Sequence, residues 1–388
     1  MPLRPHQLDA LDAMANHSKG QIIVPTGGGK TMCMIDDAER SGGTIVVVAP
    51  RILLAEQLSS EFLEQIDNVS VMHVHSGETP HYSSTKANDI AEWTLLNRLF
   101  GKRSLIFTTY HSLHRVQQSG IPVDTIYFDE AHNSVNRNFF PATKFYGTGG
   151  AGRCFFFTAT PKHSLTIQKA GMNDREVYGD VLINVPAPKL VDEGYILPPK
   201  VEVYKSRLLR KDEIYSEVES EQMIGAIDKL EVDKVLICAK STKQITGLLS
   251  ESDFCYELKM RGYSWMTITS KTGAIVNGHK VGRDEFFETL NAWGKDDNKK
   301  FVVLHHSILA EGINVKGLEA ALFMRNMDYI TISQTIGRVI RLGNEYKTHG
   351  KVCVPVYNNV GISTARKVEA VVDTVFKRGE PAISVITR

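Results

Sequence analysis

Residues 25–31, PTGGGKT, follow a short apolar segment and precede a helical pattern. Glycines let backbone N–H groups curl around phosphate oxygens, a lysine adds positive charge, and a threonine hydroxyl suits Mg²⁺. The strict phosphate-loop pattern has glycine five positions before Gly29, where this chain has Val24. A glycine-rich turn with an incidental lysine is the alternative. The strand–loop–helix context favours a phosphate loop made of Pro25, Thr26, Gly27, Gly28, Gly29, Lys30 and Thr31.

A second candidate site, with two acidic residues, lies at the end of another apolar segment, TIYFDEAH at 125–132. We expect Asp129 to hold Mg²⁺ together with Thr31, because ligands of open α/β sheets bind at the carboxyl edge of the strands. Glu130 is suited to orient and deprotonate an attacking water. Two carboxylates at a helix N-terminus are the simpler explanation of the same residues. Together with the phosphate loop, the pair predicts an ATP hydrolase with ATP and Mg²⁺ as cofactors.

The third element is QTIGRVIR at 334–341. In a helix, Gln334, Arg338 and Arg341 have i, i+4 and i+7 spacing and face the same way. Such arginines can simply be solvated. However, an arginine beside the γ-phosphate accelerates hydrolysis by about 10³–10⁵-fold, or roughly 4–7 kcal/mol. We therefore predict that these three residues complete the catalytic site from the second half of the chain, with ATP between the halves.

The elements that must position these residues are short apolar segments separated by helical patterns. Nearly continuous apolarity over a few residues is typical of strands buried on both faces. In the first half they are 21–25, 44–50, 69–75, 104–110, 125–130 and 154–160, with helices expected at 52–65 and 87–100. In the second half they are 234–240, 264–270, 299–307, 320–325 and 351–357, with helices at 283–293 and 331–342. Strands that alternate with helices predict parallel α/β sheets.

We expect two domains, since 388 residues exceed what one core usually covers. The proline-rich stretch 186–200 is the expected linker, between an ATP-binding domain at 1–185 and a second domain at 201–388. The net charge of +1 gives no overall attraction to nucleic acid, so such a partner must be argued from local sites. The five cysteines form no CxxC pair, and no apolar run reaches about twenty residues. We expect a cytoplasmic protein, bacterial or from a phage-infected host, without a membrane partner.

Taken together, PTGGGKT, DEAH, TAT (158–160) and QTIGRVIR have the order and approximate spacing of superfamily-two helicases and translocases. The chain also resembles them in a Q-type motif (LRPHQ, 3–7), motif Ia (46–57), a TTxxxL motif (107–113) and motif V (308–318). The resemblance covers nearly the whole chain. It implies an α/β fold with two RecA-like domains in tandem, each a mostly parallel sheet flanked by helices.

Within this superfamily, GINVKGL and QTIGRVIR are most similar to phage UvsW-type DNA helicases, relatives of the XPB, RadD and RecG groups. In RNA-processing DEAH-box proteins the last motif typically reads QRxGRAGR. This chain differs from that motif at Ile336, Val339 and Ile340. The resemblance also implies individual roles. Gln7 and Arg4 would bind adenine, and Gly312 would bring backbone close to the nucleotide. His132, Thr158 and Thr160 would couple hydrolysis to movement, and Arg51, Thr108 and Thr109 would contact the phosphates of one strand.

The resulting hypothesis is an ATP-dependent DNA helicase or translocase in replication, recombination or repair, acting on single-stranded, forked or branched DNA. RNA as the substrate, a translocating subunit of a larger complex without unwinding, and an ATP-switched binding protein remain alternatives. Replication or recombination proteins are candidate partners.

His73 and His75 share one face of an apolar strand and could ligate a metal. With no cysteine or carboxylate partner identified for them, we expect core packing there. Lys162 and His163, after TATP, are candidates for a nucleic-acid contact.

Overall fold

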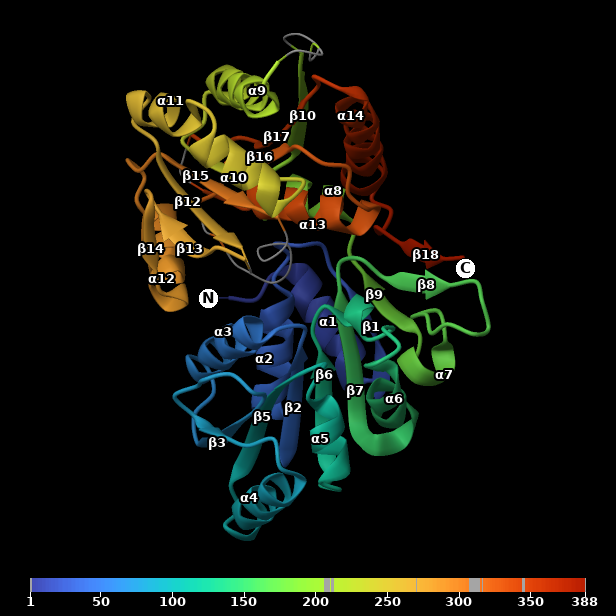
Figure 1. Cartoon of the computed structure of the whole chain (residues 1–388). Coiled ribbons are helices and arrows are strands. Elements are labelled where there is room, and N and C mark those ends of the chain that lie inside the picture. The colour runs from blue at the N-terminus through green and yellow to red at the C-terminus, as the bar shows by residue number, and fades with distance from the viewer. Residues whose placement is uncertain are drawn as a thin grey trace. The chain divides into compact units, whose positions relative to one another are not determined.

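The computed structural model describes the chain except residues 1, 206–209, 211–212, 270, 307–314, 316, 344–345 and 388. The described chain divides into two compact units. The first contains Met1–Val185 together with Pro381–Arg388, and the second contains Pro186–Glu380. Each unit has its own sheet (Figure 1).

The sheet of the first unit has, among the described residues, the strand order β4-β3-β5-β2-β6-β7-β1-β9, and each neighbouring pair is parallel. Parallel strands end at a common edge, so the residues that follow these strands are brought together. The strands are β1 (Lys19–Ile23), β2 (Thr44–Ala49), β3 (Val69–Val74), β4 (Tyr82–Ser83), β5 (Arg103–Thr109), β6 (Val123–Phe128), β7 (Ala151–Thr158) and β9 (Val181–Asn184).

Helices cover both faces of this sheet, as alternating side chains of the central strands show. Ile106, Ile126 and Phe128 belong to a core shared with helices α4, α5 and α6. On the opposite face, Phe107 stacks edge-on against Phe62 of α3, and the Tyr127 hydroxyl donates to Asp37 of α2. The helices are α1 (Pro5–Ala15), α2 (Lys30–Arg40), α3 (Ile52–Leu63), α4 (Ala87–Leu99), α5 (Leu113–Gln118), α6 (Phe140–Phe145) and α7 (Arg175–Tyr178).

The sheet of the second unit has the order β10-β17-β16-β11-β15-β12-β13-β14 among the described residues. It is parallel up to β12 and ends in the antiparallel strands β13 (Gly273–Val276) and β14 (His279–Val281). The sequence did not predict this hairpin, because its strands are short and only Ala274 in them is buried. The other strands are β10 (Pro199–Tyr204), β11 (Lys234–Cys238), β12 (Ser264–Thr269), β15 (Phe301–His305), β16 (Ala320–Phe323) and β17 (Gly350–Pro355).

Helices α9 (Tyr215–Leu230), α10 (Thr242–Ser250) and α11 (Phe254–Met260) bury their apolar sides in one core with β11 and β15. Helix α13 (Tyr329–Val339) packs on β16, β17 and α14 (Asn359–Val371). Helix α12 (Arg283–Lys295) contacts β13. Two α/β units with mostly parallel sheets flanked by helices confirm the fold class expected from the alternating pattern.

The segment 186–200 differs from the linker that we expected. It contains helix α8 (Ala187–Asp192) and the start of β10, and it groups with the second unit. Leu190 and Ile196 are buried there, so this proline-rich segment contributes to a core.

The last residues were expected in the second domain but belong to the first unit. They return to the first unit, where β18 (Ser384–Ile386) pairs in parallel with β8 (Lys162–Ser164); Figure 1 shows the red β18 beside the green β8. Pairing between strands so far apart in sequence leaves no local signal. Among the described residues, there is no helix with the length and apolar character needed to span a bilayer.

Candidate functional site

The phosphate loop connects β1 to α2 at the carboxyl edge of the first sheet. Gly27 and Gly29 have φ values of 87° and 84°, in the left-handed region that glycine adopts without strain. Gly29 is the residue before α2, so the loop leads into a helix N-terminus, where N–H groups favour an anion. Val24 is buried and its N–H donates to the Thr158 carbonyl. The strand pairing therefore continues to Val24, the position at which the chain departs from the strict pattern.

Arg4 and the first turn of α1 hold this loop through three side chains. Arg4 Nη1 donates to the Gly27 carbonyl at 3.2 Å, and Gln7 Nε2 donates to the Gly29 carbonyl at 3.0 Å. His6 Nε2 lies 2.7 Å from the Gly28 carbonyl oxygen and is buried. Sequence reasoning missed His6, although it lies between two predicted site residues. The structure thus places Arg4 and Gln7 against the phosphate loop, while adenine binding by them stays a prediction.

Asp129 follows β6 and is almost fully buried. Its N–H donates to the Val48 carbonyl, which fixes it to the neighbouring strand. Burial, and next the charge of Glu130, raise the pKa of Asp129 to about 7, and the nearby Lys30 opposes this. A buried carboxylate beside another carboxylate is stabilised by a cation. Thr31, in the first turn of α2, and Asp129 therefore suit the Mg²⁺ that they were predicted to hold.

Glu130 lies between the phosphate loop and the DEAH histidine. Its Oε1 is 3.8 Å from Lys30 Nζ, and its Oε2 is 3.5 Å from His132 Nδ1. The Oε2 atom is buried and accepts no hydrogen bond from the residues that the structure describes. The backbone of Glu130 has φ 46°, a left-handed conformation that costs a non-glycine residue of order 1–3 kcal/mol. A strained carboxylate with one unused buried oxygen is consistent with a water-activating role.

His132 joins the DEAH segment to the TAT motif after β7. Its Nδ1 lies 3.1 Å from Thr158 Oγ1 and 3.3 Å from Thr160 Oγ1. The N–H of Thr160 donates to Thr158 Oγ1 at 3.0 Å. All three residues are buried. The structure therefore brings together the residues predicted to couple hydrolysis to movement, and their role in coupling stays a prediction.

The residues predicted to contact nucleic acid lie just after β2 (Arg51) and at the end of β5 (Thr108 and Thr109), at the same edge of the sheet. Arg51 is exposed and precedes α3. Thr108 and Thr109 are buried, and the Thr108 hydroxyl donates to the Val74 carbonyl at 2.9 Å. This Thr108 hydroxyl is therefore used within the sheet, a placement that the TTxxxL motif did not indicate. Lys162 and His163 lie in β8, beside the C-terminal strand.

Gln334 and Arg338 lie on α13 in the second unit and are largely buried. The charge of Arg338, after burial, contributes to lowering the pKa of His305 to about 3. Helix α13 ends at Val339, so Arg341 lies beyond it and the expected helical stripe of three residues is wrong for Arg341. The Arg341 carbonyl instead accepts a hydrogen bond from Lys347 Nζ. Gly312 lies outside the described residues.

Residues 1–163 match the family model described as "Type III restriction enzyme, res subunit". Among solved structures, the ATP-dependent Type ISP restriction-modification enzyme LlaBIII bound to DNA matches 100% of this chain with a TM-score of 0.74 and 17% identity. A nuclease-deletion mutant of the Type ISP enzyme LlaGI, in complex with a DNA substrate mimic, matches 99% with a TM-score of 0.68 and 19% identity. The chain has the fold of two-lobed superfamily-two helicase domains.

The E. coli DExH-box NTPase HrpB shares this fold over 95% of the chain, with a TM-score of 0.55 and 12% identity. The chain spans only 31%, 30% and 43% of the lengths of LlaBIII, LlaGI and HrpB. The comparison with curated proteins finds no match. The comparisons thus show the fold of the chain and a family match over residues 1–163, and the activity of the chain is a separate question.

Proposed function

We propose that this chain is an ATP-dependent motor of the superfamily-two type that moves along or remodels DNA. The observation that carries the ATPase part is the cluster at the edge of the first sheet. There Lys30 lies 3.8 Å from Glu130, and the buried Asp129 precedes Glu130. A glycine loop at a helix N-terminus, a lysine and two carboxylates are the groups that ATP hydrolysis requires.

Each of these residues has a distinct task in the proposed reaction. The loop N–H groups and Lys30 bind the phosphates, and Thr31 and Asp129 hold Mg²⁺, which neutralises charge on the phosphates when bound. Glu130 accepts a proton from the attacking water and orients it toward the γ-phosphate. In the structure Glu130 Oε1 faces Lys30, so nucleotide phosphates that attract Lys30 would free this carboxylate for water.

The proposed catalytic site also includes three residues of the second unit, Gln334, Arg338 and Arg341. As charged or amide side chains they would stabilise the negative charge that develops during phosphoryl transfer. An arginine supplied by one unit to nucleotide bound on the other makes hydrolysis depend on domain closure. Arg338→Ala is expected to lower turnover by at least about 10³-fold with little effect on ATP binding.

The proposal that the motor moves along DNA is supported by the comparisons and by the motif resemblance. Two of the matched structures are Type ISP restriction-modification enzymes, one bound to DNA and the other in complex with a DNA substrate mimic. The departure of QTIGRVIR from the RNA-processing pattern favours the same choice, with a UvsW-type role in replication, recombination or repair as the finer proposal. RNA, or translocation without unwinding as a subunit of a larger assembly, remains the second candidate.

Measuring ATP hydrolysis in variants tests the first part. Lys30→Ala and Glu130→Gln are expected to lower turnover by at least about 10³-fold, Glu130→Gln with ATP binding retained. The surface variant Lys102→Ala is the matched control and should hydrolyse ATP like the wild type. Normal turnover in either site variant would contradict the assignment.

Stimulation of hydrolysis by different nucleic acids tests the second part. Single-stranded DNA, forked DNA, four-way junctions and RNA should be compared at several salt concentrations. We expect preference for DNA, little dependence on sequence, and a loss of stimulation with salt, because the predicted contacts are to phosphates. Preference for RNA would overturn the DNA assignment, and no stimulation would favour an ATP-switched binding protein. Strand displacement measured beside triplex displacement separates unwinding from translocation.

A further inference from the structure

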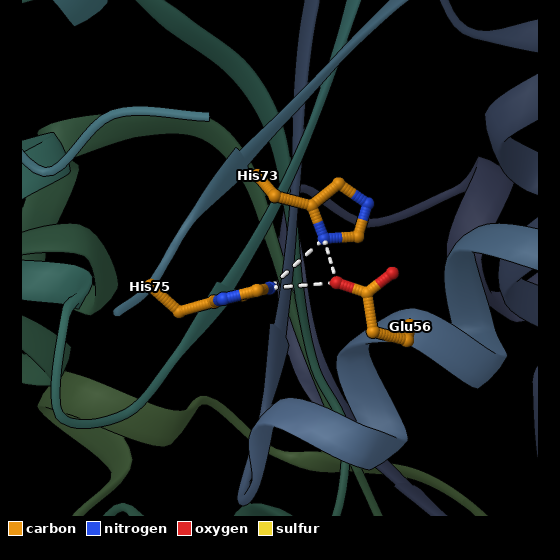
Figure 2. Close-up of side chains that lie close together, drawn as sticks. All are labelled: Glu56, His73 and His75. Carbon is orange, nitrogen blue, oxygen red and sulfur yellow. Dashed lines mark hydrogen bonds and ion pairs between the residues drawn. The ribbon is translucent and has the colours of Figure 1, made fainter. Parts of the chain in front are cut away.

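Three metal-ligating side chains converge in the first unit, apart from the proposed ATP site. Glu56 Oε1 lies 2.9 Å from His73 Nδ1 and 3.0 Å from His75 Nε2, and the two ring nitrogens are 3.0 Å apart. Figure 2 shows both imidazole rings pointing toward the Glu56 carboxylate. Two nitrogens and one oxygen thus form a nearly equilateral triangle of donor atoms.

The elements of the fold bring these residues together. His73 and His75 are two residues apart, at the end of β3, and share one face of the sheet. Glu56 comes from α3, which packs on that face beside Phe107. From the sequence, core packing was expected for both histidines because no carboxylate partner could be identified for them. The tertiary structure supplies that carboxylate.

The environment keeps both imidazoles neutral, as metal ligands must be. Burial, and next the proximity of His75, lower the pKa of His73 to about 3, and burial lowers the pKa of His75. Burial also raises the pKa of Glu56. Of the three atoms in mutual contact, Glu56 Oε1 and His73 Nδ1 are acceptors and His75 Nε2 carries the proton between them. A divalent ion that takes the place of this proton contacts all three atoms at once.

Neighbouring groups orient two of the three ligands. His73 Nε2 lies 3.0 Å from Ser59 Oγ, so this nitrogen can donate to the hydroxyl while Nδ1 keeps its lone pair. The other oxygen of Glu56 accepts a hydrogen bond from Thr79 Oγ1 at 3.1 Å. Hydrogen bonds of this kind fix ligand orientation in metal sites.

We propose that Glu56, His73 and His75 bind one divalent first-row transition metal ion, such as zinc. Zinc lies about 2.0–2.2 Å from imidazole nitrogen and carboxylate oxygen atoms. Donors separated by 2.9 to 3.0 Å can all reach one ion placed above their plane. Two histidines and one carboxylate form a known three-ligand set that leaves a position for water.

One contact changes when the metal binds. The Gly77 N–H donates to His75 Nδ1 at 3.2 Å, which leaves the proton of the neutral ring on Nε2. Metal binding at Nε2 moves that proton to Nδ1, so the Gly77 amide loses its acceptor. The Gly77 amide should therefore exchange faster in the metal-loaded protein.

Metal content and affinity of the full chain provide the test. The chelator-treated protein is titrated with zinc by calorimetry, and with cobalt by visible absorption, which distinguishes nitrogen and oxygen ligands from thiolates. We expect one ion per chain, no thiolate charge-transfer band, and a higher melting temperature with zinc. Glu56→Gln and His75→Ala should each weaken binding by at least about tenfold.

The variant His17→Ala is the matched control, because His17 is an exposed histidine of the same unit. It should bind metal like the wild type. Circular dichroism identifies a variant that fails to fold, and Glu56→Gln, at a partly exposed position, keeps the test possible in that case. No binding at micromolar zinc, or equal affinity in Glu56→Gln, His75→Ala and His17→Ala, would overturn the proposal.

Discussion

At the residue scale, His132 is the link between the proposed catalytic carboxylate and the strand that follows. Its Nδ1 contacts both threonines of the TAT motif and lies 3.5 Å from Glu130 Oε2. One ring nitrogen therefore contacts both the DEAH segment and the TAT motif. A movement of Glu130 during hydrolysis would then alter the hydrogen bond between His132 and Thr158. This geometry gives the predicted coupling role a physical basis that can be tested.

Thr158→Val removes the hydroxyl and keeps the side-chain shape. We expect ATP hydrolysis without nucleic acid to stay within about threefold, while stimulation by DNA and strand displacement fall by about tenfold or more. Thr158→Ser, which keeps the hydroxyl, is the control and should retain both. Equal losses in basal and stimulated hydrolysis would show that Thr158 serves the chemical step instead.

At the element scale, a buried cluster holds α2 against β6 and β7. Arg153 donates to both carboxylate oxygens of Asp37 at 2.8 and 2.9 Å, and the Tyr127 hydroxyl donates to the same carboxylate. Because α2 begins at the phosphate loop, this cluster also fixes the position of Lys30. It contributes to stability and only indirectly to binding.

Asp37→Ala leaves the Tyr127 hydroxyl without its acceptor and removes the ion pair of Arg153, which keeps its hydrogen bonds to Ser41 Oγ and the Met14 carbonyl. We expect the free energy of unfolding to fall by about 3 kcal/mol, measured by urea denaturation. Asp36→Ala on the same helix removes only a surface pair with the exposed Arg40, so it should cost less than about 1 kcal/mol. Equal losses would show that the buried cluster has no special importance.

The end of β15 carries a histidine whose burial has a consequence for acid stability. Burial, and next the charges of Arg338 and Arg325, lower the pKa of His305 to about 3. The unfolded chain binds this proton below about pH 6.5, so stability is lost as pH falls from 6.5 toward 3, by up to about 1.4 kcal/mol per pH unit. His305→Leu should reduce the slope of the free energy of unfolding against pH in this range by the contribution of one proton, about 1.4 kcal/mol per pH unit. An unchanged slope in denaturation experiments from pH 4 to 7 would contradict this.

At the scale of the whole molecule, the chain passes between the units twice, at Val185 and again at Glu380. In the returning segment, Ala382 is buried and β18 pairs with β8. The Leu165 N–H donates to the Ile386 carbonyl, and the Ser384 N–H donates to the Pro161 carbonyl. The final residues thus stabilise a strand directly after the TAT motif.

Deletion of residues 381–388 removes these partners and exposes β8. We expect faster hydrogen exchange at Leu165 and more rapid proteolysis within 162–173, with little change in the exchange of β1 and β6 amides. Replacing Val385, an exposed residue of β18, by threonine is the control, because it leaves the backbone pairing intact. Unchanged exchange at Leu165 after deletion would show that β18 is dispensable for β8.

The local sequence determined most of what forms the proposed ATP site. A glycine-rich loop, a Lys-Thr pair and an Asp-Glu pair each follow an apolar strand, and parallel strands place such ends on one edge. Continuous apolar runs likewise located the central strands, because strands buried on both faces have no polar side. The end of α13 could not be predicted from the sequence, because the helical pattern continues through Arg341 whereas the helix ends at Val339.

Only the tertiary structure decided contacts between residues distant in sequence. The pairing of β18 with β8 and the approach of Glu56 to His73 and His75 depend on chain paths that no local pattern encodes. The burial of Thr108 and the hold of His6 on the phosphate loop are similar cases. Sequence specifies the chemistry that each segment carries, because side-chain types are local. Packing decides which of these groups meet, because distances between segments are set by the whole fold.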